Sequence, residues 1–254
     1  MSFIRNAGGG AYTNATPVPT AVGGVEAGST FSNVPLTDMW DDLLYPYQSP
    51  AFTSFSISGQ STLLEVGAEL AAGDKLFTWS TSNSGNIEPA SLDIKDITGA
   101  LDLVIGTTDD GSETTYIDAI AKSTAASHTW RISAVNTNAN TFTRDFKVNW
   151  YWKVYYGESP LTALTETDIE ALRMGELKSN SANVYTLLGG DYKWLCYPTA
   201  MGLKATFIDV NTGFPIAMEP ATIVSVTNLY GITTDYYTHR TTNTLGSGIT
   251  VGVS

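Results

Sequence analysis

The sequence predicts a mainly β protein, and three observations support this. Its 254 residues include 35 Thr and 13 Tyr, which suit the pleated, half-buried surface of a sheet. Only 15% of its residues are charged, fewer than long surface helices need. Short apolar segments alternate with turn residues at the spacing of an immunoglobulin-like β-sandwich, roughly one strand every 8–15 residues. We expect an N-terminal arm with an anchoring helix over 1–48, the sandwich over 49–157, and a second β-rich domain with one helix over 158–254.

The first part has little to bury. Residues 1–20 contain three consecutive glycines and two prolines, and therefore predict an extended arm without a core of its own. Residues 22–31 alternate short apolar positions with turn residues and predict a small β element.

A short amphipathic helix is predicted next. Five apolar residues recur at i, i+3, i+4, i+7 and i+8, behind Pro35 in the first turn and ahead of Pro46, which ends the helix. The other face is acidic and predicts a solvated surface. Because the arm offers no core to cover the apolar face, we expect this face to be an assembly interface. Its residues are Leu36, Met39, Trp40, Leu43 and Leu44.

Seven short strands are expected in the sandwich, with Trp79 and Trp130 as its core anchors. Turn residues such as Gly73-Asp74 and Thr98-Gly99 separate the strands. The expected strands lie within residues 52–58, 76–80, 92–94, 101–105, 115–120, 129–135 and 142–155.

The last of these segments alternates two faces up to residue 156. One face consists of Phe146, Val148, Trp150, Trp152 and Val154. The other face carries Tyr151 and Tyr155 among lysines, which predicts either stacking on a sugar or packing against another domain or subunit. Tyr236 and Tyr237 would complete the sugar-stacking set.

The third part opens with a well-marked helix. Thr165 is the predicted N-cap, Asp168 completes an acidic variant of the capping box, and Leu164 can pack on Ile169 as a hydrophobic staple. We expect this helix to end near residues 178–180. The strands expected after it lie within residues 192–197, 203–210, 216–218, 222–226, 233–239 and 249–253.

The composition excludes several classes of partner. With 13 Lys and Arg against 25 Asp and Glu, the net charge is −12, and no basic stripe exists to neutralise a nucleic-acid backbone. We expect no membrane insertion, because no apolar stretch approaches the roughly 18 residues of a membrane span. The N-terminus also lacks the apolar region of a secretory signal.

The residues that catalysis needs are equally scarce. His128 and His239 are the only histidines and Cys196 is the only cysteine, without a G-x-S-x-G elbow or zinc-ligand spacing. We expect both histidines to be structural and Cys196 to be a buried small hydrophobe. The acidic residues gather in turns and helix starts, which the helix dipole favours, so we expect no enzyme, cofactor or metal site. A calcium ion in the turn 109–113 is an alternative that lacks EF-hand spacing.

Several phrases of the sequence carry a family resemblance. They are Val22 to Phe31 followed by Leu43-Leu44-Tyr45-Pro46-Tyr47, then residues 77–83, 150–158 and 231–237. In these phrases the chain resembles virion structural proteins of tailed bacteriophages, specifically tail and baseplate-associated proteins. The resemblance implies no catalytic residues. It implies an assembly role, with other virion proteins as partners and a cyclic homo-oligomer, a trimer being favoured.

These observations together predict a non-enzymatic virion subunit, either a tail fibre or a baseplate-attached protein, assembled in the host cytoplasm. Residues 1–48 are expected to anchor it, and its distal surface to contact the host. One alternative is a carbohydrate-binding module that stacks a host-surface glycan on the four tyrosines. The other is a capsid decoration protein.

Overall fold

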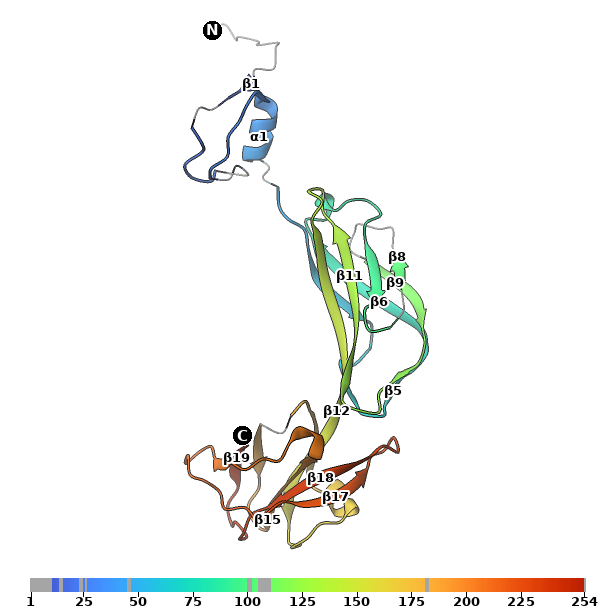
Figure 1. Cartoon of the computed structure of the whole chain (residues 1–254), viewed down its shortest axis with the longest axis vertical. Helices are drawn as coiled ribbons and strands as arrows, with labels where there is room; N and C mark the ends of the chain where they lie inside the picture. The colour runs from blue at the N-terminus through green and yellow to red at the C-terminus, as the bar shows by residue number, and fades with distance from the viewer. Residues whose placement is uncertain are drawn as a thin grey trace.

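The computed structural model describes most of the chain, and strands dominate it. Strands hold 51% of the residues and helices 9%, which confirms the mainly β prediction. In Figure 1 the elements form three successive bodies along the long axis, ending with the C-terminal strands. The described residues are 11–13, 16–22, 25, 27–44, 47–99, 102–104, 111–180 and 183–253.

The N-terminal module, residues 11–44, is more ordered than an extended arm. Strand β1 (Ala11–Tyr12) pairs antiparallel with β2 (Val34–Pro35), which leads directly into helix α1 (Leu36–Leu44). Between them, the Val18 amide donates to the Ser29 carbonyl at 3.0 Å. The helix bounds match the prediction. In the described part of the arm, backbone pairing brings β1 alongside β2. Val25 is the one buried apolar residue among the described residues of this module.

The middle body, which we call the sandwich (residues 50–153), consists of two facing sheets. Strands β3, β6 and β9 form one sheet, and β8, β7, β11 and the first half of β12 form the other. The elements are β3 (Ala51–Ile57), β4 (Leu63–Glu65), β5 (Glu69–Leu70), β6 (Gly73–Ser82), η1 (Ser84–Asn86), β7 (Asp93–Asp96), β8 (Asp102–Val104), β9 (Gly111–Ile117), β10 (Ile120–Ala121), β11 (Ala126–Val135) and β12 (Thr141–Ser159).

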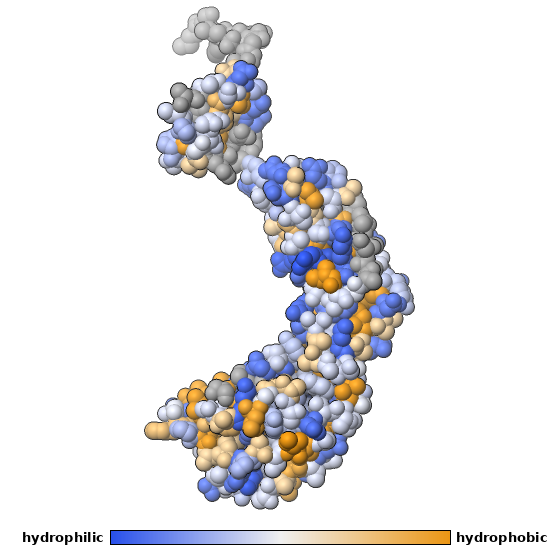
Figure 2. Space-filling view, viewed as in Figure 1, coloured by the Kyte–Doolittle hydropathy of each residue, from blue (hydrophilic) through white to orange (hydrophobic). Residues whose placement is uncertain are grey.

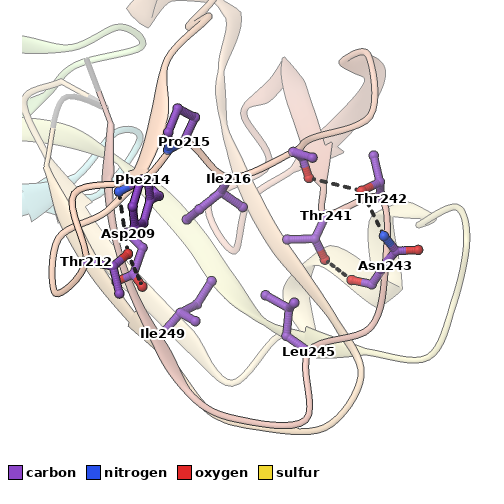
Figure 3. A pocket seen from close by; sticks show the side chains of 11 residues that line it. Asp209, Thr212, Phe214, Pro215, Ile216, Thr241, Thr242, Asn243, Leu245 and Ile249 are labelled. Atoms are coloured by element: carbon purple, nitrogen blue, oxygen red, sulfur yellow. Dashed lines mark hydrogen bonds between the residues drawn. The ribbon is translucent and has the colours of Figure 1, made fainter.

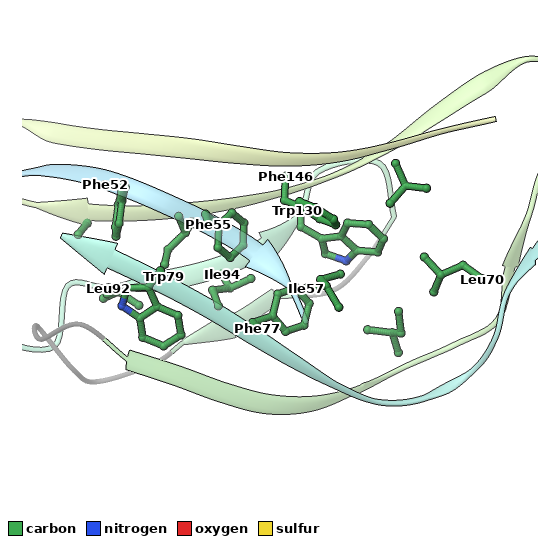
Figure 4. Packing of buried hydrophobic residues seen from close by; sticks show 14 of the residues in the cluster. Phe52, Phe55, Ile57, Leu70, Phe77, Trp79, Leu92, Ile94, Trp130 and Phe146 are labelled. Carbon is green, nitrogen blue, oxygen red and sulfur yellow. The ribbon is translucent and has the colours of Figure 1, made fainter. Parts of the chain in front are cut away.

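Aromatic side chains fill the space between these sheets (Figure 4). The two predicted anchors are confirmed, since Trp79 is 2% exposed and Trp130 is completely buried. The Trp130 ring lies 6.4 Å from Phe77 across the core and 6.2 Å from Phe146 on the neighbouring strand. The predicted apolar face of the long strand, from Phe146 to Val154, is buried throughout, so its alternation is confirmed as well.

Strand β12 belongs to two bodies at once. Its first half pairs with β11 through Trp150, and its second half pairs with β13 and β15 from Trp152 to Ser159. The sandwich core ends at Trp152 and the next core begins at Val154. One uninterrupted strand of 19 residues therefore crosses from the sandwich into the C-terminal body, which we call the distal domain (residues 154–253).

A second contact, separate from β12, joins these two bodies. The buried Asn228 side chain donates through Nδ2 to the Val66 carbonyl at 2.6 Å. Gly67, with φ of +89°, lies against Tyr230 and Ile232 so closely that an added Cβ would be 2.7 Å from each. The sandwich and the distal domain are thus held together at two points.

The distal domain is a sheet covered on both faces. Strands β17, β18, β15, the end of β12 and β13 form the sheet, and β14, β19 and β16 form a smaller sheet against one face. Helix α2 covers the other face, where Ile169 contacts the core around Trp194 and Tyr236. The elements are α2 (Glu166–Glu170), β13 (Met174–Lys178), β14 (Val184–Leu187), β15 (Tyr192–Pro198), η2 (Thr199–Met201), β16 (Phe207–Asp209), β17 (Thr222–Thr227), β18 (Thr233–Arg240) and β19 (Ile249–Val253).

The start of α2 is as predicted, but its end is not. Thr165 and Asp168 form a complete capping box, with each side chain bonded to the other's backbone amide. The helix stops at Glu170, and residues 174–178 become strand β13, because pairing with β12 satisfies their backbone groups. Two expected strands are also corrected: 203–210 shortens to β16, and 216–218 forms no strand beyond an isolated bridge.

Candidate functional site

The apolar face of α1 is exposed rather than packed. Leu36, Trp40 and Leu44 are 42%, 58% and 61% exposed, while Met39 and Leu43 are half-buried. Figure 2 shows hydrophobic surface on this module beside hydrophilic surface. Exposed apolar side chains that lie together on one helix mark a surface for association. The assembly interface stays a prediction, and its five residues are accessible to a partner.

The four tyrosines do not form one sugar-stacking platform. Tyr155 and Tyr236 are 6% and 2% exposed, their rings lie 5.8 Å apart in the core beneath α2, and this burial raises the pKa of both hydroxyls. Tyr237 is half-buried on the opposite face of the sheet, 5.9 Å from Tyr197, and Tyr151 is half-buried on β12. The stacking prediction is therefore wrong for Tyr155 and Tyr236, whose rings pack inside the distal domain instead.

His128 is held by a carboxylate in the sandwich. Its Nε2 lies 2.7 Å from Oδ2 of Asp96, and both side chains are nearly buried. The other Asp96 oxygen accepts hydrogen bonds from the amides of Thr98 and Gly99. The Asp96 carboxylate therefore holds both the turn and the imidazole of His128 in place. The adjacent hollow of about 390 Å³ has neither serine nor cysteine among its lining residues.

His239 lies in the core of the distal domain. Its Nε2 is 2.9 Å from the hydroxyl of Tyr197, and that hydroxyl accepts a hydrogen bond from the Lys204 amide. A neutral imidazole can take either role towards this hydroxyl, according to its tautomer. Burial lowers the pKa of His239 to about 4, in agreement with this arrangement.

The neutral His239 makes stability depend on pH. Its pKa falls from 6.5 in the unfolded chain to about 4 in the folded one, so the unfolded state takes up the proton first as the pH decreases. The stabilisation is complete above pH 6.5 and is lost on acidification towards pH 4, by roughly 3 kcal/mol. Urea unfolding at pH 7 and pH 4.5 should show a larger loss for the wild type than for His239→Gln. Equal losses in the two proteins would contradict this.

Metal chemistry finds no support in the described ranges. No group of three or more His, Cys, Asp and Glu side chains there can hold a metal ion. Residues 109 and 110 of the turn 109–113 lie outside these ranges, and residues 111–113 belong to β9. Cys196 is buried, and burial raises the pKa of its thiol, as its expected role as a small hydrophobe requires.

Figure 3 shows an apolar hollow in the distal domain between the β16 hairpin and the segment 241–249. It measures about 290 Å³, and Phe214, Ile216, Leu245 and Ile249 line it. Its polar groups are occupied locally, since Asp209 accepts from the Thr212 hydroxyl at 2.9 Å and other hydroxyls bond to backbone carbonyls. The hollow therefore offers apolar surface without a catalytic set.

A further hollow, of about 330 Å³, lies where the segment before α2 crosses the central sheet. Trp194 and Arg240 line it, and sequence reasoning missed both. They face each other on β15 and β18 through the strand register, which places distant segments side by side. The sequence places Trp194 and Arg240 on two predicted strands. Only the register of those strands shows that the two residues are paired.

The comparisons with known proteins add no relative. Neither the protein-family models nor the curated protein sequences include a match to this chain. Among the described residues, no helix combines the length and the apolar character that crossing a membrane requires.

Proposed function

We propose that this chain is a non-enzymatic structural subunit of a tailed-bacteriophage virion, attached as a tail fibre or baseplate component through its N-terminal residues 1–48. The exposed apolar face of α1 is the observation that carries the proposal. The sequence resemblance supports it.

The energetics of this face favour attachment as an oligomer. Fully burying an exposed side chain of this size supplies roughly 1.5–3 kcal/mol. Leu36, Trp40 and Leu44 are 42%, 58% and 61% exposed, so covering what remains supplies roughly 2–5 kcal/mol together. Association costs an estimated 4–15 kcal/mol in lost freedom of motion. One helix therefore gives weak attachment, whereas several linked copies bind the particle together with a high effective concentration. This supports the proposed homo-oligomer, with a trimer favoured on the resemblance.

Trp40→Glu in the full-length chain tests the anchor. We expect incorporation into particles to fall about tenfold or more. The substitution removes the buried apolar ring from the interface and forces a carboxylate there to give up its hydration. The folded sandwich should be unaffected, since Trp40 is 58% exposed. Incorporation is measured by quantitative blotting of purified particles against a major virion protein.

Asp41→Asn is the matched control on the polar side of α1, where the side chain is exposed. It should leave incorporation unchanged. If Trp40→Glu or a chain lacking residues 1–48 enters particles at the wild-type level, the anchoring role is wrong. Gold-labelled antibody on the same particles distinguishes tail attachment from a capsid decoration protein.

A further inference from the structure

The hollow beside α2 contains hydrogen-bond donors without acceptors. The Trp194 side chain is 2% exposed, and its indole N–H has no partner in the described part of the chain. The Arg240 side chain is 16% exposed, and its nearest carboxylate oxygen, on Glu219, is 3.8 Å away, beyond hydrogen-bond distance. A guanidinium carries five N–H donors, and buried donors are normally satisfied. The indole N–H is thus a buried donor without a partner, and the partly exposed guanidinium of Arg240 has no direct acceptor among the described residues.

Both donors are held in place by their surroundings. The guanidinium carbon of Arg240 lies 4.3 Å from the ring centre of Tyr192, which fixes the plane of the fork by a cation–π contact. Trp194 and Arg240 are directly paired across β15 and β18, so both side chains lie on the same face of the sheet. Preorganised donors lose little freedom when a ligand binds.

The other residues that line the hollow indicate which kind of acceptor it fits. A carboxylate matches the guanidinium fork in two parallel hydrogen bonds. The hollow also contains the exposed carboxylate of Glu219 and the hydroxyls of Thr162 and Thr222. The Glu219 carboxylate repels a second carboxylate, and all three groups can accept hydrogen bonds from hydroxyl groups. The site therefore fits a molecule that combines one carboxylate with several hydroxyls.

We propose that this hollow binds an acidic sugar, with its carboxylate on Arg240 beside the Trp194 ring and its hydroxyls towards Glu219. The hollow of about 330 Å³ lies at the small end of the range for ligand sites, which suits one sugar ring such as a uronic acid. The inference goes beyond the assembly role and does not depend on α1. It assigns the distal domain a specific ligand class in place of the tyrosine platform.

The full-length protein can be titrated with glucuronate, galacturonate and N-acetylneuraminate while the indole N–H signals are followed by NMR. The chain has six tryptophans, and Trp194→Phe identifies the signal of Trp194 by its disappearance. We expect at least one acid to shift that signal saturably, and the neutral isostere glucose to leave it unchanged. Calorimetry measures the affinity.

Arg240→Gln should weaken the binding about tenfold or more, since it removes a charge-assisted bidentate contact. Arg240→Lys keeps the charge without the fork and should give an intermediate affinity, which covers the case where the glutamine variant fails to fold. Arg131→Gln is the matched control, because Arg131 pairs with Asp145 on the surface of the sandwich. The proposal is overturned if no sugar acid shifts the Trp194 signal, if N-acetyl-aspartate shifts it while the sugar acids do not, or if Arg240→Gln binds as well as Arg131→Gln.

Discussion

Trp130→Ala should lower the free energy of unfolding by about 3–5 kcal/mol, a large part of the roughly 5–15 kcal/mol that a domain has. Trp130 is completely buried between the two sheets of the sandwich, and its ring contacts Phe77, His128 and Phe146. Removing it leaves a cavity that strands on both sides would have to move to fill. Urea unfolding followed by far-UV circular dichroism measures the loss.

Two further tryptophan variants make this prediction specific. Trp130→Phe should cost much less, because a ring is kept and the lost indole N–H has no partner in the described part of the chain. Trp40→Ala should change the free energy of unfolding by no more than about 0.5 kcal/mol, because Trp40 is 58% exposed. If Trp40→Ala destabilises the protein as much as Trp130→Ala, the sandwich core is not where the structure places it.

Gly67→Val should loosen the sandwich from the distal domain while both remain folded. The new Cβ would lie 2.7 Å from Tyr230 and Ile232, and neither contact atom is the far end of a flexible polar side chain. The turn carrying Asn228 must then move away, so the hydrogen bond from Asn228 to Val66 breaks. Overpacking of this kind costs about 1–3 kcal/mol. Hydrogen exchange at residues 228–232 should rise sharply.

Gly59→Val provides the matched control for backbone strain. Gly59 also has a positive φ, of +69°, but an added Cβ there meets nothing within 4 Å. Both variants therefore pay for an unfavourable conformation, and only Gly67→Val adds the clash. Exchange at residues 228–232 that rises equally in the two variants, or in neither, would show that the Gly67 contact does not hold the two bodies together.

Local patterns in the sequence predicted the elements that depend on local chemistry. The capping box at Thr165 and Asp168 and the alternation from Phe146 to Val154 are confirmed, because each depends on neighbours in the chain. The end of α2 was mispredicted, since residues 174–178 gain more from pairing with β12 than from extending a helix. That gain depends on a partner strand, so the sequence of residues 174–178 alone does not indicate it.

Among the candidate sites, too, only the one defined by a local pattern was predictable from the sequence. The apolar face of α1 was predictable, because periodicity alone defines it. The tyrosine platform failed because alternation gives the face of a strand but not what covers that face, and at Tyr155 the cover is α2. Trp194 and Arg240 become neighbours only through the register of β15 and β18, which no local pattern specifies.

The continuity of β12 determines how the protein responds to a pull along its long axis. The same backbone is bonded to β11 in the sandwich and to β15 in the distal domain, so tension entering one body passes into the other through covalent bonds. Antiparallel hydrogen bonds run perpendicular to the strands, and such a pull therefore loads them in shear, all together, instead of peeling them one by one. The junction between the two bodies therefore transmits tension, and we expect the sheets to yield only at forces that shear a whole ladder.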